Sequence, residues 1–477
     1  MVSFWVYDVA FLVLFTLFII VFLHKKRANL ERQGILFLYK TKLGIKLMDW
    51  TVDKFRGFLK PLQYIVVASG FILMISMIWL LIKTVYLYMT SPIIIQLIRA
   101  PPIAPLIPYF PTLFNMESFF PQLYFTYFLI ALVIVAVSHE FAHGIFARFY
   151  KIRIKTTGFA FLGPILGAFV EPDEKQMQKA KKFPQLTILA AGTFANVVMT
   201  VIFGLILGGF FALSFAPAGI NFNTYGSEQI NVDSINSING QQINDISQIA
   251  GMLSDENLLI DISASSLEGT QKNYLIRENN LKFAIEASAE QITVFDDSPA
   301  ARSGLRGPIT QINGEKITSI KSLQNELNNY SPGDEIIVTT KQDGNVDNHE
   351  LILGERNGQA YLGIGFLNSG RGGVIGWFMT NVVENVKDPF IYYESRWDGD
   401  FAWFIYYLLW WIVIINILVA LFNMLPVSIL DGGRFFYLSV WGITGSEKIG
   451  KKAFAFATWF IVALLILMMV RWAISFF

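Results

Sequence analysis

The chain has 477 residues, with 37 Lys and Arg against 36 Asp and Glu, so its net charge is near +1. Apolar residues make up 54% and charged residues only 15%, whereas soluble proteins carry about 25% charged residues, which excludes a chain that is water-soluble throughout. No basic excess is present to neutralise phosphates, so we expect no nucleic-acid partner, and the absence of cysteine excludes disulfides, thiolate metal sites and cysteine nucleophiles.

Six apolar segments are long enough to cross a bilayer, which takes about 20 mostly apolar residues in a helix. They are Phe4–Leu23, Tyr64–Tyr88, Leu123–Tyr150, Leu186–Phe215, Phe401–Leu425 and Ala453–Trp472. Basic residues follow the first segment and none precede it, which favours a membrane anchor with its N-terminus outside over a cleavable signal peptide. The sequence thus predicts a polytopic α-helical membrane protein with about six transmembrane helices.

Loop charges predict its orientation, because cytoplasmic loops are rich in Lys and Arg. Residues 24–60 hold ten such residues, 151–185 hold seven and 426–452 hold four, but 89–122 hold one. These three basic loops are therefore expected in the cytoplasm, and residues 216–400 outside the cell membrane. For the 24–60 segment we expect a cytoplasmic surface helix bound to anionic lipid.

The polar segment 216–400 contains an internal repeat. Ile238-Asn239-Gly240-Gln241-Gln242-Ile243 recurs as Ile312-Asn313-Gly314-Glu315-Lys316-Ile317, and helix-like stretches follow at Ile246–Leu253 and Ile320–Leu327. Asn-Gly between apolar runs predicts a tight hairpin turn in each copy.

The second copy of the repeat resembles a PDZ domain of membrane-associated proteases over residues 288–368. The resemblance rests on Ser298–Leu305 before the turn and Pro332-Gly333-Asp334 after the helix-like stretch. The first copy, 216–287, resembles a degenerate PDZ-like unit. A generic β-rich extracytoplasmic domain is the alternative for both.

The third apolar segment ends in Ser138-His139-Glu140-Phe141-Ala142-His143-Gly144. Helical residues four apart share a face, so His139 and His143 can bind one ion while Glu140 beside them handles a proton. Ionisable side chains inside a transmembrane helix are costly and usually functional. The alternative is a polar cluster that packs helices together.

Catalytic zinc usually has three protein ligands and a water. The other histidines, His24 and His349, lie in a basic flank and in the polar segment, so a carboxylate is the expected third ligand. Asp431 is the best candidate, because Pro426 breaks the fifth span just before it and glycines follow it. The weaker candidates are Asp8, Glu171 and Asp173.

His-Glu-x-x-His in one span, followed much later by Leu-Asp-Gly, resembles the site-2 protease family of intramembrane zinc metalloproteases. The resemblance covers roughly residues 120–442, and Asn423-x-x-Pro426-x-x-x-Leu430-Asp431-Gly432 meets a pattern of that family in full. It implies that His139, His143 and Asp431 bind Zn²⁺ and that Glu140 is the general base.

Two further features follow from this resemblance. Asn196, in Ala191-Gly192-Thr193-Phe194-Ala195-Asn196, stands where the family has an asparagine, with Thr193 where proline is common. It is expected to assist the substrate carbonyl, and an interhelical hydrogen bond is the alternative. Residues 157–170 are expected to form a membrane-inserted β-hairpin whose edge pairs with an extended substrate, or else an interfacial loop.

The predicted function is hydrolysis of peptide bonds within or next to transmembrane segments of other membrane proteins. The active site is expected near the cytoplasmic side of the lipid bilayer, because His139 lies about 24 Å along its helix from Leu123, and the PDZ-like insert is expected to bind a peptide outside. A PDZ-bearing membrane receptor or adaptor with a vestigial metal site is the alternative. A zinc protease that degrades soluble polypeptides is a third interpretation, which the apolar setting disfavours.

The predicted domains follow the chain. They are 1–119 (two N-terminal helices, a basic loop and a Pro-rich outer loop), 120–215 (catalytic core, first part), 216–287 and 288–368 (PDZ-like units), 369–400 (linker) and 401–477 (catalytic core, second part).

Overall fold

The computed structural model divides into two compact units, residues 1–210 with 400–477 and residues 211–399. It describes residues 4–90, 105–117, 120–243, 249, 253, 258–342, 344–367 and 386–474. Most of the predicted stretch Ile246–Leu253, most of the linker 369–400 and much of the Pro-rich loop 89–122 lie outside the described residues.

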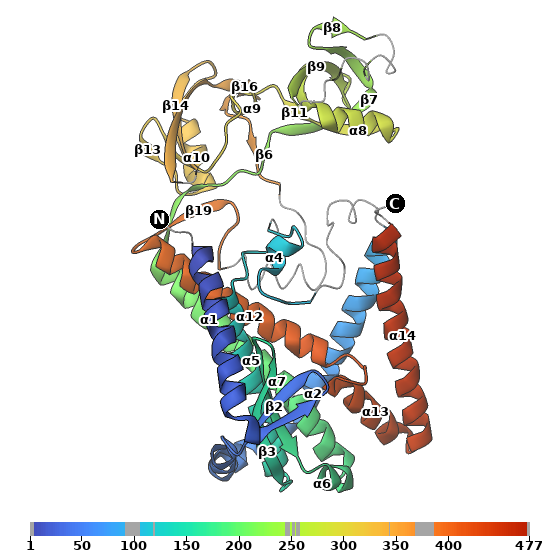
Figure 1. The fold of residues 1–477 in the computed structure, drawn as a ribbon. Helices are drawn as coiled ribbons and strands as arrows, with labels where there is room; N and C mark the ends of the chain where they lie inside the picture. Colours follow the sequence, from blue (N-terminus) through green and yellow to red (C-terminus); the bar gives the residue numbers. More distant parts are fainter. Residues whose placement is uncertain are drawn as a thin grey trace. The chain divides into compact units, whose positions relative to one another are not determined.

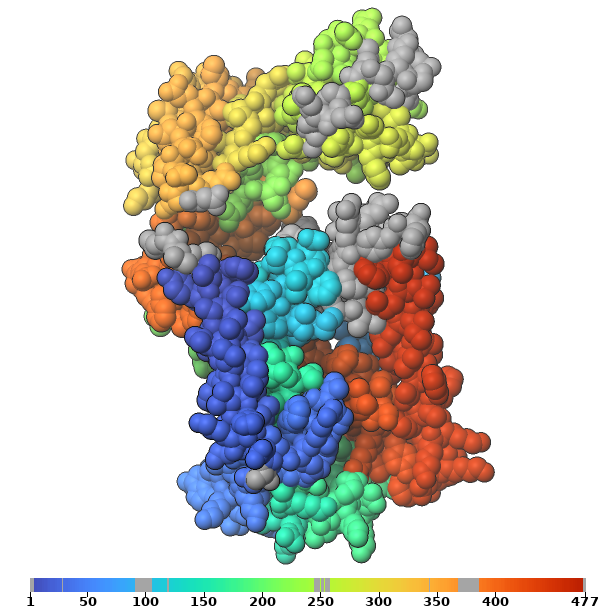
Figure 2. Space-filling view, viewed as in Figure 1, coloured from blue at the N-terminus to red at the C-terminus, as the bar shows by residue number. Residues whose placement is uncertain are grey.

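The first unit contains six described helices that are long and apolar enough to cross a membrane (Figure 1). They are α1 (Phe4–Lys25), α2 (Ile45–Thr90), α5 (Phe125–Phe149), α7 (Lys182–Ser214), α12 (Gly399–Asn423) and α14 (Glu447–Ile474). The predicted polytopic α-helical membrane protein is confirmed at this level. Many apolar side chains of α1 are exposed, as a lipid-facing helix requires, and α1 runs along the outside of this unit in Figure 2 (dark blue).

The segment 24–60 is not one surface helix. It contains an antiparallel hairpin, β1 (Leu30–Gln33) and β2 (Leu36–Thr41), before α2 begins. α2 is kinked at Phe55 and contains Pro61, which cannot donate the hydrogen bond of a regular helix. The sequence-based expectation was wrong here, because the turn and pairing of this short hairpin depend on a neighbouring strand.

That neighbour is the hairpin expected at residues 157–170. β3 (Ile154–Leu162) and β4 (Ile165–Pro172) form it, and β2 pairs with β3, so the sheet has the order β1-β2-β3-β4. Gly158 of β3 has no room for a side chain, since a Cβ would lie 2.0 Å from the Tyr39 carbonyl oxygen. The N-terminal hairpin β1–β2 therefore extends the central hairpin β3–β4 and covers its β3 edge.

The core of the first unit lies where α2, α5, α7 and α13 (Asp431–Thr444) meet. Met48, Val66, Phe146, Ile188 and Phe435 are each at most 4% exposed and belong to one apolar cluster. Two short helices complete this unit in the described residues. They are α4 (Phe110–Leu113) and α6 (Glu174–Lys179).

The second unit contains two sheets with separate apolar cores. The first has the order β11-β10-β9-β7-β8, with β11 also paired to β7, so four of its strands close on themselves. Its strands and helix are β7 (Ser227–Ile238), β8 (Gln241–Gln242), β9 (Leu259–Ser266), β10 (Gln271–Arg277), β11 (Gln291–Asp296) and α8 (Glu278–Glu286).

The second sheet has the order β15-β14-β12-β5-β19, with β13 beside β12. Its elements are β5 (Phe215–Ile220), β12 (Ile309–Ile312), β13 (Glu315–Lys316), β14 (Glu335–Gln342), β15 (Asn345–Ile352), β19 (Ile391–Ser395), α9 (Pro299–Arg302) and α10 (Ile320–Leu327). Four short strands pair separately, β6 (Thr224–Tyr225) with β18 (Ile364–Gly365) and β16 (Gly354–Arg356) with β17 (Gln359–Tyr361). The two sheets thus exchange strands across the boundary expected at residue 288, and β19 lies in the segment expected to be a linker.

Both predicted hairpin turns are confirmed. Asn239 and Gly240 connect β7 to β8, and Asn313 and Gly314 connect β12 to β13, with positive φ at all four residues. Asn and Gly adopt this left-handed conformation at little cost, so they set the register of each hairpin. The helix-like stretch of the second copy is α10, and a capping box between Ser319 and Ser322 stabilises its N-terminus.

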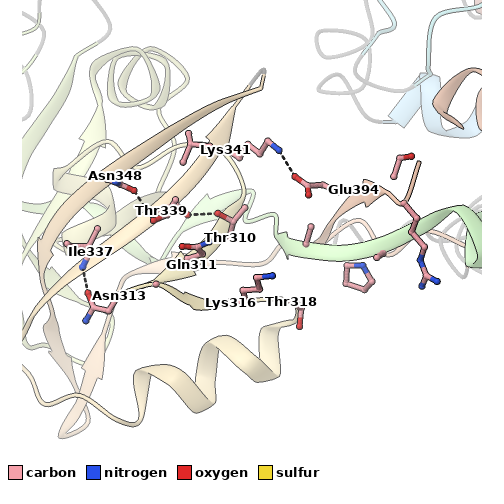
Figure 3. Close-up of a pocket in the computed structure, with 17 residues that line it drawn as sticks. Thr310, Gln311, Asn313, Lys316, Thr318, Ile337, Thr339, Lys341, Asn348 and Glu394 are labelled. Carbon is pink, nitrogen blue, oxygen red and sulfur yellow. Dashed lines mark hydrogen bonds and ion pairs between the residues drawn. The ribbon is translucent and has the colours of Figure 1, made fainter. Parts of the chain in front are cut away.

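A polar pocket of about 740 Å³ lies on the second sheet (Figure 3). Lys341 pairs with Glu394 at 2.5 Å beside it, and Asn348 accepts a hydrogen bond from Thr339. The candidate metal residues do not line this pocket and belong to the first unit.

Candidate metal centre

His139 and His143 lie one turn apart on α5. No proline interrupts this helix, and its residues before His139 are mostly apolar, so the helix continues to both histidines. They are 6% and 9% exposed, and their rings meet edge to face with centroids 4.7 Å apart. Together with Glu140 they form a group whose ligand atoms all lie within 4.8 Å of one another.

Asp431 approaches the two histidines from the start of α13. Its Oδ2 lies 3.2 Å from His139 Nε2 and 3.3 Å from His143 Nε2. α12 ends before Pro426, and the chain turns so that Asp431 is the first residue of α13. The predicted carboxylate and the two predicted imidazoles therefore converge, although 288 residues separate His143 from Asp431 in sequence.

The turn at Asp431 requires the glycines that follow it. A Cβ at Gly432 would lie 2.3 Å from the carbonyl carbon of Met424, and one at Gly433 would lie 2.2 Å from the Val427 oxygen. Such contacts are far too short, so only glycine lets α13 begin so close to the preceding loop.

The distances from the Asp431 Oδ2 atom to the Nε2 atoms of His139 and His143 fit a zinc site. Tetrahedral zinc binds nitrogen and oxygen at about 2.0–2.2 Å, which places its ligand atoms about 3.3–3.5 Å apart. The distances from Asp431 match this spacing. Helix α7 leaves room at the same point, because a Cβ on Gly192 would lie 2.5 Å from His143 Nε2 and 2.6 Å from His139 Nε2.

The second nitrogen of each histidine has its own partner on α7. His143 Nδ1 lies 2.6 Å from the Ile188 carbonyl oxygen, and His139 Nδ1 lies 3.1 Å from Asn196 Nδ2. Since a carbonyl accepts, His143 Nδ1 carries a proton, and in the neutral imidazole its Nε2 has a lone pair. Such partners fix ring orientation in metal sites. For a neutral His139 to bind through Nε2, the Asn196 amide must present its oxygen, not its NH2 group, to Nδ1.

Asn196 is fully buried and contacts His139, a metal-ligand candidate. Ser138 Oγ also donates to Asn196 Oδ1 at 3.4 Å. The interhelical hydrogen bond that the sequence left open as an alternative is therefore present. The expected role of Asn196 at a substrate carbonyl stays a prediction.

Glu140 is held by the central hairpin. Its Oε2 accepts a hydrogen bond from the Val170 N–H of β4 at 2.9 Å. This bond fixes the carboxylate beside the histidines and ties β4 to α5. The edge of β4 that faces Glu140 is not paired with any of the described strands.

The weaker ligand candidates lie elsewhere and have other partners. Thr156 Oγ1 donates to Glu171 at 2.7 Å, and Asp173 caps α6 by accepting from Gln176 N–H at 3.1 Å. His349 Nε2 lies 3.1 Å from the Thr340 hydroxyl in the second unit. Among the described residues, none of these joins the metal-binding group.

Asp8 has a role that the sequence did not reveal. It is 1% exposed, and its carboxylate accepts four hydrogen bonds of 2.6–2.9 Å. Two come from the backbone N–H groups of Phe125 and Thr126, one from the Thr126 hydroxyl and one from Tyr109. Asp8 therefore caps the start of α5 from another helix. An acid in an apolar span was the available signal, but its partner was not readable.

A polar pocket of about 640 Å³ lies between α6, α7, α13 and α14, and none of the candidate metal ligands lines it. Gln185 of α7 and Gly433 and Arg434 of α13 line it, and Arg434 pairs with Glu174 of α6 at 2.9 Å.

Six apolar helices around a His-Glu-His-Asp group define the class as a membrane metallopeptidase. Comparison with known proteins agrees, because the sequence model of peptidase family M50 matches residues 127–469. The chain belongs to this family, the site-2 protease family that its motifs predicted. The predicted zinc metalloprotease class is thus confirmed at the level of the family.

Two relatives were found. An "Uncharacterized protein MJ0971" of Methanocaldococcus jannaschii is 35% identical over 120 residues, which is 25% of this chain and 33% of that protein. The "Zinc metalloprotease RasP" of Shouchella clausii is 24% identical over 220 residues, 39% of this chain and 51% of that protein. The chain thus spans a third to a half of the length of these relatives.

Proposed function

We propose that this chain is an intramembrane zinc metalloprotease that hydrolyses peptide bonds within or next to transmembrane segments of other membrane proteins. The approach of the Asp431 carboxylate to within 3.3 Å of both His139 and His143, with Glu140 beside them on an apolar helix, carries this proposal. The family and the name of the RasP relative support it.

The chain's own residues assign the chemistry. His139, His143 and Asp431 would hold the ion, which supplies Lewis acidity to the reacting groups. Glu140 takes a proton from the attacking water and returns it to the leaving amine. The hydrogen bond from Val170 keeps the Glu140 carboxylate in place for both transfers.

The substrate must be extended where it is cut, because the carbonyls of a helix are already hydrogen-bonded. The edge of β4 beside Glu140 offers backbone groups to which an extended strand can add. β2 covers the β3 edge of the hairpin, so strand addition next to the catalytic residue is left to β4. Helix-breaking residues near the cut should favour cleavage.

The direct experiment is the variant Glu140→Gln in the full chain, in proteoliposomes with a membrane-anchored test protein. We expect cleavage to fall at least a hundredfold while bound zinc, measured by elemental analysis, stays at the wild-type level. Undiminished cleavage by this variant would reject the enzyme proposal and favour the receptor or adaptor with a vestigial metal site. Cleavage of soluble casein in preference to the anchored protein would favour the third interpretation.

We also propose that residues 288–368 act as a PDZ-like filter or peptide sensor, placed outside the cell membrane, with the active site near its cytoplasmic side. Deleting this segment would remove β11 from the other sheet, so a point variant is a better test. Gly363 has φ +90°, and a Cβ there would lie 2.1 Å from Ser298. We expect Gly363→Ala to change the preference among substrates with bound zinc unchanged, while Gly358→Ala, which has open space, changes neither.

A further inference from the structure

A small apolar pocket of about 190 Å³ opens beside Glu140. Three parts of the first unit form it: residues 41–48 before and at the start of α2, the Val137–Phe141 turn of α5, and the central hairpin β3–β4. Ligand sites for whole small molecules usually measure about 300–1,000 Å³. This volume equals about six water molecules, which suits a single large side chain.

The lining of this pocket is apolar apart from its catalytic end. Among the described residues that line it, Glu140 alone is ionisable, and most of the other lining side chains are aliphatic or aromatic. A charged side chain that enters would lose its hydration without gaining a partner other than the catalytic carboxylate. The pocket therefore selects against charge.

One wall is open to the apolar surface of the unit. The side chains of Leu43, Leu47 and Val137 are 71%, 53% and 45% exposed, so the described elements leave them largely uncovered. Met48 forms the closed end at 2% exposure, packed so tightly on α5 that a Cβ at Gly144 would lie 2.5 Å from its sulfur. A side chain can therefore enter from the lipid-facing side and stop at Met48.

We propose that this pocket receives the apolar side chain of a substrate residue adjacent to the scissile bond, and that residues 43–48 set the size it accepts. This inference rests on the proposed function. Glu140 lines the pocket and is bonded to Val170 of β4, so a residue bound there has its peptide group beside the catalytic carboxylate. Residues 43–48 lie outside the region that the family model matches, 127–469, so this wall belongs to the N-terminal part of this chain.

Leu47 is the position for the test, because it lines the pocket at its open side. The probes are synthetic peptides with one apolar 20-residue span that a Gly-Pro pair interrupts. They differ only at the residue next to this Gly-Pro pair, which is Ala, Leu, Phe, Trp or Lys. Cleavage in detergent micelles is followed by mass spectrometry for the wild type, Leu47→Ala and Leu47→Trp. Leu205 of α7 is 74% exposed and does not line the pocket, so Leu205→Ala and Leu205→Trp are matched controls.

We expect the wild type to prefer Leu or Phe over Lys by at least about a hundredfold in kcat/KM. Leu47→Ala should shift the preference toward Trp by about tenfold and Leu47→Trp should shift it toward Ala by a similar factor, with the Leu205 variants unchanged. Equal profiles for the Leu47 variants and the wild type would overturn the pocket assignment and leave the protease proposal intact.

A binding measurement separates the two proposals. The same peptides, each labelled with a fluorescent dye, are titrated with the variant Glu140→Gln, alone and combined with each Leu47 substitution. The fluorescence of the dye reports their affinity. The affinity order should shift as the cleavage order does. If the wild type cleaves none of the peptides but the affinity order shifts, the pocket stands and the protease proposal fails. If neither cleavage nor affinity responds to Leu47, the pocket assignment fails.

Discussion

Two carboxylates of the first unit, from α1 and α13, contact helix α5, and their surroundings differ. Asp8 meets α5 at its N-terminus and accepts four hydrogen bonds from groups that carry their own protons. Asp431 meets α5 fourteen or more residues further on and faces two imidazole nitrogens that share one of its oxygens. The first carboxylate is satisfied by the protein alone.

The second carboxylate is not satisfied in that way. A neutral His143 that donates its Nδ1 proton to Ile188 has only a lone pair at Nε2, so Asp431 and His143 then present two electron pairs to the same space. Lone pairs that converge at the spacing of zinc ligands are stabilised by a cation between them, and this donor set fits zinc. The contrast teaches that the direction of the partner protons distinguishes the structural acid Asp8 from the proposed metal ligand Asp431.

Removing Asp431 should have the largest effect. Asp431→Ala deletes one of three protein ligands, so we expect less than a tenth of wild-type zinc in the purified protein and loss of cleavage by about a thousandfold or more. Elemental analysis of wild type and variant side by side is the measurement, with the exposed Asp347→Ala as control. Full zinc content in Asp431→Ala would remove it from the ligand set, and a chelator should mimic the variant in the wild type.

Filling the space for the ion should have nearly the same effect without touching a ligand. In Gly192→Ala the new methyl group would lie about where zinc binds, so we expect zinc affinity to fall at least about a hundredfold. Gly204→Ala on the same helix has nothing within 4 Å and should bind zinc as the wild type does. A competition titration with a zinc-binding dye measures both. Equal affinities would show that α7 does not approach the ion this closely.

Asn196 should have an intermediate effect, which also decides between its two roles. If it orients His139, Asn196→Ala should weaken zinc binding by about 10–100-fold, as partners of ligand histidines do. If it acts on the substrate carbonyl instead, zinc affinity should be unchanged and kcat should fall. The same dye titration, paired with kcat and KM at saturating zinc, separates these results.

The sequence predicted those parts of the site that depend on contacts between residues close together in the chain. The spacing of His139 and His143 on one helix, and the Pro426 and glycine turn at Asp431, are short patterns with a definite geometry, and they led directly to the metal-ligand candidates. The hairpin turns at Asn239-Gly240 and Asn313-Gly314 were readable for the same reason.

Contacts between distant segments were not readable. Nothing in the sequence around Asp8 indicates that it caps α5, and nothing in residues 30–41 indicates that they join β3. The room at Gly192 is also invisible, because a glycine in an apolar helix has many uses and only the approach of two imidazoles explains this one. The exchange of strands between the two sheets of the second unit has the same origin, since strand pairing is set by tertiary packing.

The smallest effect should come from the cap itself. Asp8→Asn removes the negative charge and replaces one carboxylate oxygen, which accepts two of the four hydrogen bonds, by an NH2 group. We therefore expect a loss of about 2 kcal/mol in the free energy of unfolding, with bound zinc still stoichiometric. Tyr109→Phe removes one of the four donors and should cost about 1 kcal/mol. Unfolding in mixed micelles with increasing SDS measures both. If Asp8→Asn lost zinc while its stability stayed at the wild-type level, the two carboxylates would act together, and the division between a structural acid and a metal ligand would not hold.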